Sequence, residues 1–240
     1  MGIKHTVGKF INNVIDASIK YNYKSTPFIP NGRILPLDLK RAGISPEVIF
    51  DAGANIGQTA NYFIKHFPQA DIYCFEPVKA TYDELIKNVK SDKIHPFNEG
   101  LGAEIKALTI HKNNSSGSSS LKGDDGRFFE TELVQINTGQ NFCELNKIEM
   151  IDILKMDVEG FEIDVLKGFG PLLGSKVKMI YSEVGFEKQD HYKTYICDLL
   201  ETVSEHGFIV SGFYEPYRWG NGKLKVFYNV LLTNTRLIDI

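Results

Sequence analysis

A glycine-rich loop in the first third of the chain has the residue types of a ligand-binding turn. Asp51, Gly53, Asn55 and Gly57 follow directly after the apolar run 48–50 and precede a helical pattern. Glycines at such a turn let the backbone approach a ligand closely, and the N-terminus of a helix favours an anionic group. Ligands of the nucleotide type bind at the carboxyl ends of parallel strands. The loop therefore predicts a cofactor site after the first strand.

Two side chains of this loop indicate which ligand it fits. The dinucleotide fingerprint needs a second glycine so that a pyrophosphate can reach bare backbone, and Asn55 occupies that position. The carboxylate of Asp51 would repel a pyrophosphate, but it suits the ammonium of an amino acid, whose carboxylate the helix N-terminus can receive. S-adenosylmethionine carries both groups, so the loop favours this cofactor over a dinucleotide. A tight turn with Asp51 as N-cap is the alternative that involves no ligand.

A second carboxylate stands at the end of the second predicted strand. Glu76 follows the run 72–75, and Pro77 behind it prevents the strand from continuing. A carboxylate at this position can accept hydrogen bonds from both hydroxyls of a ribose. Glu76 is therefore expected to bind the sugar of the same cofactor.

Three carboxylates at the ends of the fourth and fifth predicted strands are candidates for chemistry on an acceptor. A methyl transfer depends on the positioning of its acceptor, and general-base help to a hydroxyl is typically worth about 10² to 10⁴-fold in rate. We expect Asp157 first, then Glu159 and Glu183, to act as the base or to bind the acceptor. Helix capping is the alternative for Asp157 and Glu159, and it is the favoured interpretation of Glu162.

Other readings of these segments remain open. The same three carboxylates are oxygen ligands that suit a divalent metal, but a third ligand motif is lacking and no metal site is predicted. His111 and His191 are further candidate bases, although an isolated histidine is more often structural or solvated. The aromatic segment 214–219, expected in the turn between the last two strands, either stacks on an acceptor or is a hairpin tip.

The elements that position these residues begin at about residue 47, where strands start to alternate with helices. This order predicts a parallel sheet with right-handed crossovers. Segments 107–111 and 132–136 alternate like edge strands, and the polar stretch 113–126 between them reads as an exposed loop. Segments 208–213 and 225–232 predict an antiparallel pair at one edge of the sheet. The remaining predicted strands are 48–50, 72–75, 94–97, 151–156 and 177–181, and the predicted helices include 79–89, 161–173 and 192–206.

The N-terminal part reads differently. Residues 3–19 predict an amphipathic helix, which either caps the core, the favoured interpretation, or serves as a lid or a homodimer contact. A proline-containing connector and a short helix at 37–45 follow. The expected organisation is a helical appendage at 1–45 and a catalytic domain at 46–240.

Four segments in order resemble the FkbM family of methyltransferases: VIFDAGANIG (48–57), CFEP (74–77), NEGLG (98–102) and LKMDVEGFE (154–162). The similarity covers about residues 47–185. It implies a Rossmann-like α/β fold of the class I methyltransferases, with a mainly parallel seven-stranded sheet and an antiparallel edge strand. It also implies S-adenosylmethionine as donor and, usually, a hydroxyl acceptor on a sugar or polyketide-like metabolite.

The resemblance also assigns positions to the cofactor site. It places Asp51, Gly53, Asn55, Gly57 and Glu76 there, and it puts Asn98, Glu99, Gly100 and Leu101 near the adenine. The chain departs from the family pattern at Gly100, where alanine is more usual, and in its serine-rich loop at 113–120. Neither departure affects the expected cofactor site, but the loop leaves the choice of acceptor open.

The bulk properties exclude several classes. The chain of 240 residues carries a net charge of −3, and no stretch concentrates one sign, so we do not expect a nucleic-acid partner. Three scattered cysteines without a CxxC pair indicate a reducing compartment, and no segment is long enough to span a bilayer. We therefore expect a cytoplasmic location.

The leading hypothesis is an S-adenosylmethionine-dependent O-methyltransferase that acts on a sugar, a glycan or a related metabolite. The alternatives are an N-methyltransferase, a partner subunit that binds the cofactor without catalysis, and a dehydrogenase in third place.

Overall fold

The structure is a computed structural model that describes residues 31–113, 119–120, 128–190, 193–219 and 225–239. The predicted helix at 3–19, His191 and most of the serine-rich loop lie outside the described residues. The N-terminal appendage and its boundary at residue 45 therefore stay predictions.

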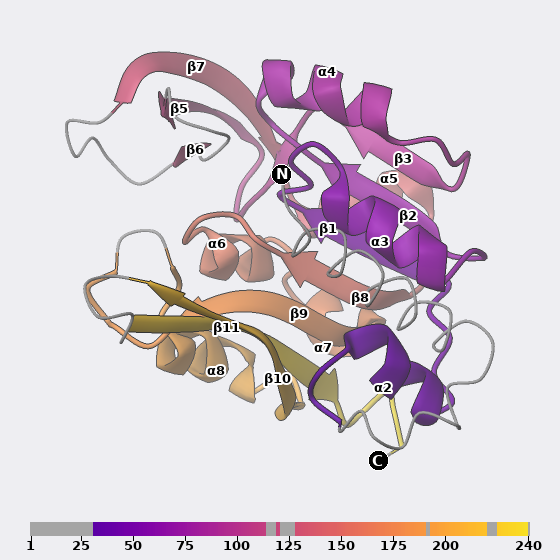
Figure 1. The fold of residues 1–240 in the computed structure, drawn as a ribbon. Coiled ribbons are helices and arrows are strands. Elements are labelled where there is room, and N and C mark those ends of the chain that lie inside the picture. The colour runs from indigo at the N-terminus through magenta and orange to yellow at the C-terminus, as the bar shows by residue number, and fades with distance from the viewer. Residues whose placement is uncertain (1–30, 114–118, 121–127, 191–192, 220–224, 240) are drawn as a thin grey trace, which may run out of the picture.

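The main sheet has seven strands in the order β10-β11-β9-β8-β1-β2-β3 (Figure 1). Five neighbouring strands pair in parallel, and β11 runs antiparallel to both of its neighbours, β9 and β10. The predicted mainly parallel sheet with an antiparallel pair at one edge is confirmed. The strands are β1 (Val48–Ala52), β2 (Asp71–Phe75), β3 (Ile94–Phe97), β8 (Ile151–Met156), β9 (Val177–Gly185), β10 (Phe208–Trp219) and β11 (Lys225–Asn234).

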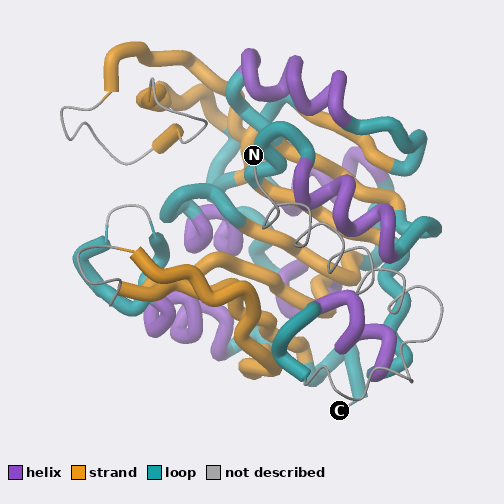
Figure 2. Tube along the Cα trace, in the orientation of Figure 1, coloured by secondary structure: helices purple, strands orange, loops and turns teal. Residues whose placement is uncertain are grey.

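Helices cover both faces of this sheet, which makes three layers (Figure 2). Successive strand residues alternate between the two cores: Ile49 of β1 packs with one group of helices, and Phe50 packs with the other. One face is covered by α2 (Leu35–Arg41), α3 (Gln58–His66) and α4 (Lys79–Asn88), and the other by α5 (Gly139–Asn146), α6 (Glu162–Lys167), α7 (Leu172–Lys176) and α8 (Ile196–Ser204).

A second sheet of four strands stands at the carboxyl-end side of the first, between β3 and β8 in the chain. It consists of β4 (Gly100–Leu101), β5 (Lys106–Asn113), β6 (Ser119–Ser120) and β7 (Phe128–Asn137). Segments 107–111 and 132–136 therefore do not border the main sheet, because Ile110, Val134 and Ile136 bury their side chains against Val78 in a small core of their own. Ser119 and Ser120, expected in a loop, pair with β5.

Three further segments differ from the sequence prediction. The helix expected at 161–173 is divided into α6 and α7, because Gly170 adopts a positive φ of 50° and Pro171 restarts the chain as an N-cap. Helix α5 was not predicted; the hydroxyl of Thr138 caps it by accepting from the backbone N–H of Asn141 at 3.1 Å. The aromatic segment 214–219 lies within β10 instead of in a turn.

Candidate functional site

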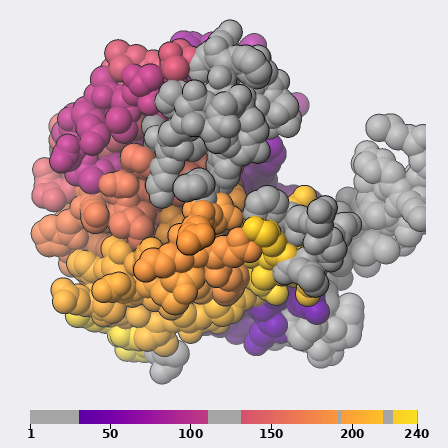
Figure 3. Space-filling view, turned by 90° about the vertical axis from the view of Figure 1, so that its left-hand side faces the viewer, coloured from indigo at the N-terminus to yellow at the C-terminus, as the bar shows by residue number. Residues whose placement is uncertain are grey.

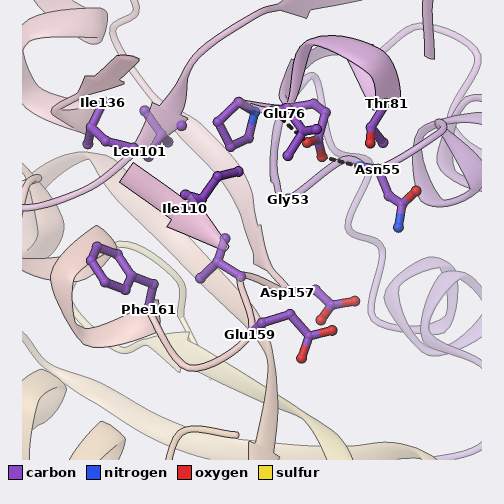
Figure 4. A pocket seen from close by; sticks show the side chains of 14 residues that line it. Gly53, Asn55, Glu76, Thr81, Leu101, Ile110, Ile136, Asp157, Glu159 and Phe161 are labelled. Atoms are coloured by element: carbon purple, nitrogen blue, oxygen red, sulfur yellow. Dashed lines mark hydrogen bonds between the residues drawn. The ribbon is translucent and has the colours of Figure 1, made fainter. Parts of the chain in front are cut away.

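A pocket lies where the loops after β1, β2 and β8 meet the second sheet (Figure 4). It holds about 800 Å³ of empty space, including the part open to solvent. We call it the glycine-loop pocket. Of the residues predicted from the sequence, those that line it are Gly53, Asn55, Glu76, Gly100, Leu101, Asp157 and Glu159.

The loop after β1 is shaped by two glycines with positive φ. A Cβ on Gly53, at φ 74°, would lie 2.0 Å from the carbonyl oxygen of Asp157, so only glycine lets this loop pack against the loop after β8. Gly57, at φ 89°, is the N-cap of α3 and does not line the pocket. Asn55 also has a positive φ, and its side-chain oxygen accepts from the backbone N–H of Ile56 at 2.8 Å. The turn therefore holds Asn55 at the pocket wall.

The carboxylate of Glu76 is buried at the centre of the pocket wall. Its Oε2 accepts from the backbone N–H of Asn55 and its Oε1 from that of Val78, both at 3.0 Å. Burial raises the pKa of Glu76 to about 7 despite these two donors. Each oxygen keeps further acceptor capacity, so the side chain can bind a pair of ligand hydroxyls.

Apolar side chains form the opposite part of the pocket, on the left in Figure 4. Ile110 and Ile136 come from the second sheet, Leu101 from β4, and Val158 and Phe161 from the loop after β8. Of these residues, only Leu101 was predicted to lie in the site. Ile110 and Ile136 were not, because segments 107–111 and 132–136 were expected at an edge of the main sheet. The alternation in 107–111 and 132–136 was the available signal, but it does not show which surface the apolar face meets.

Asn98 and Glu99, predicted near the adenine, are not among the residues that line the pocket. The Asn98 side-chain amide donates to the carbonyl oxygens of Glu76 and Pro77 at 3.0 and 3.1 Å. Glu99 accepts from the amide of Asn137 at 3.2 Å. Asn98 thus fixes the turn that carries Glu76, while its direct contact with a ligand stays a prediction. The backbone of His111 is part of β5, where it pairs with Ser120.

Asp51 is fully buried and paired with a lysine. The Nζ of Lys155 lies 2.8 Å from its Oδ1 and also donates to the carbonyl oxygen of Gly53 at 3.0 Å. Burial opposes the charge of Lys155, but attraction to Asp51 and Asp157 outweighs it and raises the pKa of the lysine. Lys155 was not predicted to take part, although a lysine within an apolar strand indicates a buried partner.

The other two predicted catalytic carboxylates, Glu159 and Glu183, cluster around a second lysine. Lys193 contacts Glu183 and lies 3.2 Å from Glu159, whose φ is 52°. Burial raises the pKa of Glu183 to about 7, and nearby Asp157 adds to the shift. Asp157 and Glu159 line the pocket, whereas Glu183 does not. Lys193 was missed, because it comes from the connection between β9 and α8, which carries no motif.

The carboxylate of Glu162 fixes the loop that carries Asp157 and Glu159, whereas α6 has no side-chain cap hydrogen bond. One oxygen of this buried carboxylate accepts from the backbone N–H groups of Val158 and Gly160 at 3.1 and 3.4 Å, and the other accepts from the hydroxyl of Thr194. Within the described part of the chain, no group of three or more histidine, cysteine, aspartate or glutamate side chains has the arrangement of a metal site.

Figure 3 shows the molecule from the side to which the carboxyl ends of the parallel strands point. The magenta and pink surface of α4 and the second sheet lies above the orange surface of the C-terminal half.

None of the helices described by the structure is long and apolar enough to cross a membrane.

Residues 51–210 match the family model described as the methyltransferase FkbM domain. This range contains the glycine loop, Glu76, the second sheet and the Asp157 loop. The match therefore covers two-thirds of the chain and the whole glycine-loop pocket.

Individual relatives agree with this match. The chain is 32% identical over 143 residues to Methyltransferase 1 of Beauveria bassiana, covering 50% of the chain and 57% of that protein. It is 26% identical to the 2-O-methyltransferase NoeI of Sinorhizobium fredii, covering 61% of the chain and 65% of that protein. It is 31% identical to the hexuronic acid methyltransferase AglP of Haloferax volcanii, covering 54% and 52%. The chain thus spans between about half and two-thirds of the length of these relatives.

Among solved structures, one similar chain is the methyltransferase FkbM from Methylobacillus flagellatus KT. The TM-score is 0.49 at 14% identity, and the match covers 77% of this chain and 43% of that one.

Proposed function

The chain belongs to the FkbM methyltransferase family, and we propose on this basis that it is an S-adenosylmethionine-dependent O-methyltransferase. Its acceptor would be a hydroxyl group of a sugar, a glycan or a related metabolite. The observation that carries the proposal is the buried carboxylate of Glu76, which two backbone N–H groups hold beside the glycine loop. The name of AglP describes methylation of a hexuronic acid and supports a sugar acceptor, and the name of NoeI describes methylation of an oxygen.

The glycine-loop pocket fits the adenosine part of this cofactor. Glu76 offers one acceptor oxygen to each ribose hydroxyl, in the position that favours a ribose at the end of the second strand. The apolar walls formed by Leu101, Ile110, Ile136 and Phe161 suit a flat adenine ring. Gly100 brings the backbone close to this wall, because a Cβ there would lie 2.9 Å from Cδ1 of Ile136.

The methionine part meets a charge arrangement that the sequence did not indicate. Asp51 was expected to bind the ammonium group directly, but Lys155 already neutralises this carboxylate. The second oxygen, Oδ2, is buried without a hydrogen-bond partner among the described residues, and Asp51 does not line the glycine-loop pocket. We assign Asp51 to the cofactor site with Lys155 between its charge and the solvent, and we therefore expect Glu76 to contribute more to affinity.

When bound, S-adenosylmethionine supplies a methyl group from its sulfonium, and the leaving group is a neutral thioether. The acceptor hydroxyl must lose its proton as the new carbon–oxygen bond forms. We assign Asp157, the exposed carboxylate at the end of β8, as the base that accepts this proton, because Glu159 and Glu183 are already paired with Lys193. Glu159 and Glu183 then keep Lys193 in place, which makes them positioning residues in this proposal.

Calorimetry with S-adenosylhomocysteine, followed by mass spectrometry of a host extract incubated with isotope-labelled S-adenosylmethionine, tests the proposal. We expect binding by the wild-type protein and a methyl ether in the product. Glu76→Gln should weaken this binding, and Glu104→Gln is the matched control, since Glu104 is an exposed carboxylate that pairs with Lys106 outside the pocket. Binding of NADH in place of S-adenosylhomocysteine would revive a dehydrogenase. Methylated amines would identify an N-methyltransferase, and binding without any product would favour a non-catalytic subunit.

A further inference from the structure

A second pocket lies beside the glycine-loop pocket and shares one residue with it. It contains about 870 Å³ of empty space, including the part open to solvent. We call it the hairpin pocket, because the β10–β11 hairpin forms one wall with Glu215 and Asn229. The first turns of α3 contribute Thr59 and Tyr62, and β9 contributes Tyr181. Asp157 lines both pockets, so ligands bound in the two would meet at this carboxylate.

Glu215 is aimed into the hairpin pocket by an irregularity of the edge hairpin. Tyr214 pairs with Asn229 and Tyr217 pairs with Phe227, so two residues of β10 lie opposite the single residue Tyr228 of β11. This is a β-bulge, and Glu215 within it has a φ of 50°, which non-glycine residues rarely adopt. Bulges of this kind re-aim side chains near functional sites.

Two donors hold the carboxylate of Glu215 in this direction. The hydroxyl of Tyr181 donates to Oε2 at 3.2 Å, and the side-chain amide of Asn229 donates to the same oxygen at 2.6 Å. Burial raises the pKa of Tyr181, with the charge of Glu215 adding to the shift, so this phenol remains a donor at neutral pH. Both donors therefore act on one oxygen of Glu215. Among the described residues the other oxygen has no hydrogen-bond donor, so a ligand hydroxyl can donate to it.

The side chains around Glu215 suit a ring that carries several hydroxyl groups. Carboxylate and amide groups side by side accept from and donate to neighbouring hydroxyls, and Thr59 adds a hydroxyl on the facing wall. Tyr62 adds an aromatic side chain, 36% exposed, which can cover the apolar face of such a ring. These features recur in sites for sugars more than in sites for apolar molecules, because the polar groups would remain unpaired there.

We propose that the hairpin pocket is the acceptor subsite and that it binds a sugar ring through neighbouring hydroxyl groups, with Glu215 as a specificity-determining residue. The proposal rests on the proposed methyltransferase function, since only then does a second ligand need to reach Asp157. Tyr181 and Asn229 are positioning residues that act through Glu215.

The test uses the full chain saturated with S-adenosylhomocysteine and saturation-transfer difference NMR. The probes are the methyl pyranosides of glucose, galactose and mannose together with glucuronic acid, and cyclohexylmethanol is the ring without neighbouring hydroxyls. We expect at least one sugar to bind the wild-type protein and cyclohexylmethanol not to bind. Glu215→Gln keeps the size of the side chain and should weaken the sugar about tenfold, as loss of a charged hydrogen-bond acceptor does. Glu187→Gln, an exposed carboxylate paired with Lys225 outside this pocket, is the control and should bind as the wild type does.

The outcomes separate this inference from the function on which it rests. Failure of S-adenosylhomocysteine to bind counts against the methyltransferase proposal itself. Normal binding of S-adenosylhomocysteine with no bound sugar, or with equal sugar affinity in Glu215→Gln, would overturn the acceptor subsite. Circular dichroism of Glu215→Gln verifies that the variant is folded, and an unchanged affinity for S-adenosylhomocysteine verifies that the first pocket is intact.

Discussion

Each end of β8 contributes one member of a lysine–aspartate pair, and the two pairs differ in their hydrogen bonds. At the amino end, Asp152 pairs with Lys178 at 2.7 Å and also accepts from the backbone N–H groups of Glu47 and Val48. At the carboxyl end, Lys155 pairs with Asp51, whose Oδ2 has no hydrogen-bond partner among the described residues. In the first pair both oxygens of Asp152 have partners, which link β8 to β9 and to the start of β1. The second is incomplete, and its Lys155 lines the hairpin pocket, so this pair lies at the end of the sheet where ligands are expected to bind.

The largest expected difference between the two ends is in catalysis. Asp157→Asn should lower the rate of methyl transfer about 10² to 10⁴-fold, because the acceptor hydroxyl loses its general base. Asp152→Asn, on the same strand, should leave that rate unchanged. The yield of labelled product from host extract measures both variants. A turnover in Asp157→Asn equal to that of Asp152→Asn would remove Asp157 from the chemistry.

The next difference is in stability. Lys155→Met leaves the carboxylate of Asp51 buried without its partner, which costs about 3–5 kcal/mol of unfolding free energy. Lys178 is 34% exposed and Asp152 retains two backbone donors, so Lys178→Met should cost only about 0–1 kcal/mol. Urea denaturation monitored by circular dichroism compares the two variants. Equal urea midpoints for the two variants would show that the two ion pairs contribute equally to stability.

A smaller effect is expected on cofactor affinity. Glu76→Gln removes a charged acceptor from the ribose hydroxyls, and we expect S-adenosylhomocysteine to bind about 10 to 100-fold more weakly. Glu104→Gln should bind normally. Calorimetry gives both constants, and a wild-type affinity in Glu76→Gln would rule out the ribose assignment.

The smallest expected effect is a pH dependence of the same affinity. The pKa of Glu76 is raised to about 7, and ribose hydroxyls donate to the ionised form. Affinity should therefore be constant above pH 8 and should fall as the pH drops below 7, by about tenfold per pH unit at the limit. Glu76→Gln should show no such dependence. A fall in affinity toward high pH would have the wrong sign for this carboxylate.

The sequence predicted the parts of the molecule that depend on local patterns. The apolar strands, the glycine loop and Glu76 lie where periodicity and the order of elements placed them, since each depends on few neighbouring residues. The second sheet was misplaced, because the alternation of Ile110 or Ile136 shows that a face is buried but not against what. Lys193 had no local signal, and Glu215 was noted only as part of the aromatic segment 214–219, a candidate contact for an acceptor. Their positions depend on an irregular connection and on a bulge, which only the packed structure defines.

A double-mutant cycle on the ribose tests whether Glu76 binds the sugar hydroxyls of the cofactor. It compares the affinities of S-adenosylhomocysteine and its 3′-deoxy analogue for the wild-type protein and for Glu76→Gln. If Glu76 holds the ribose at the carboxyl end of the sheet, the wild type should prefer the natural ligand and Glu76→Gln should lose most of that preference. An equal preference in both proteins would contradict the account, because the 3′-hydroxyl would then have its partner elsewhere.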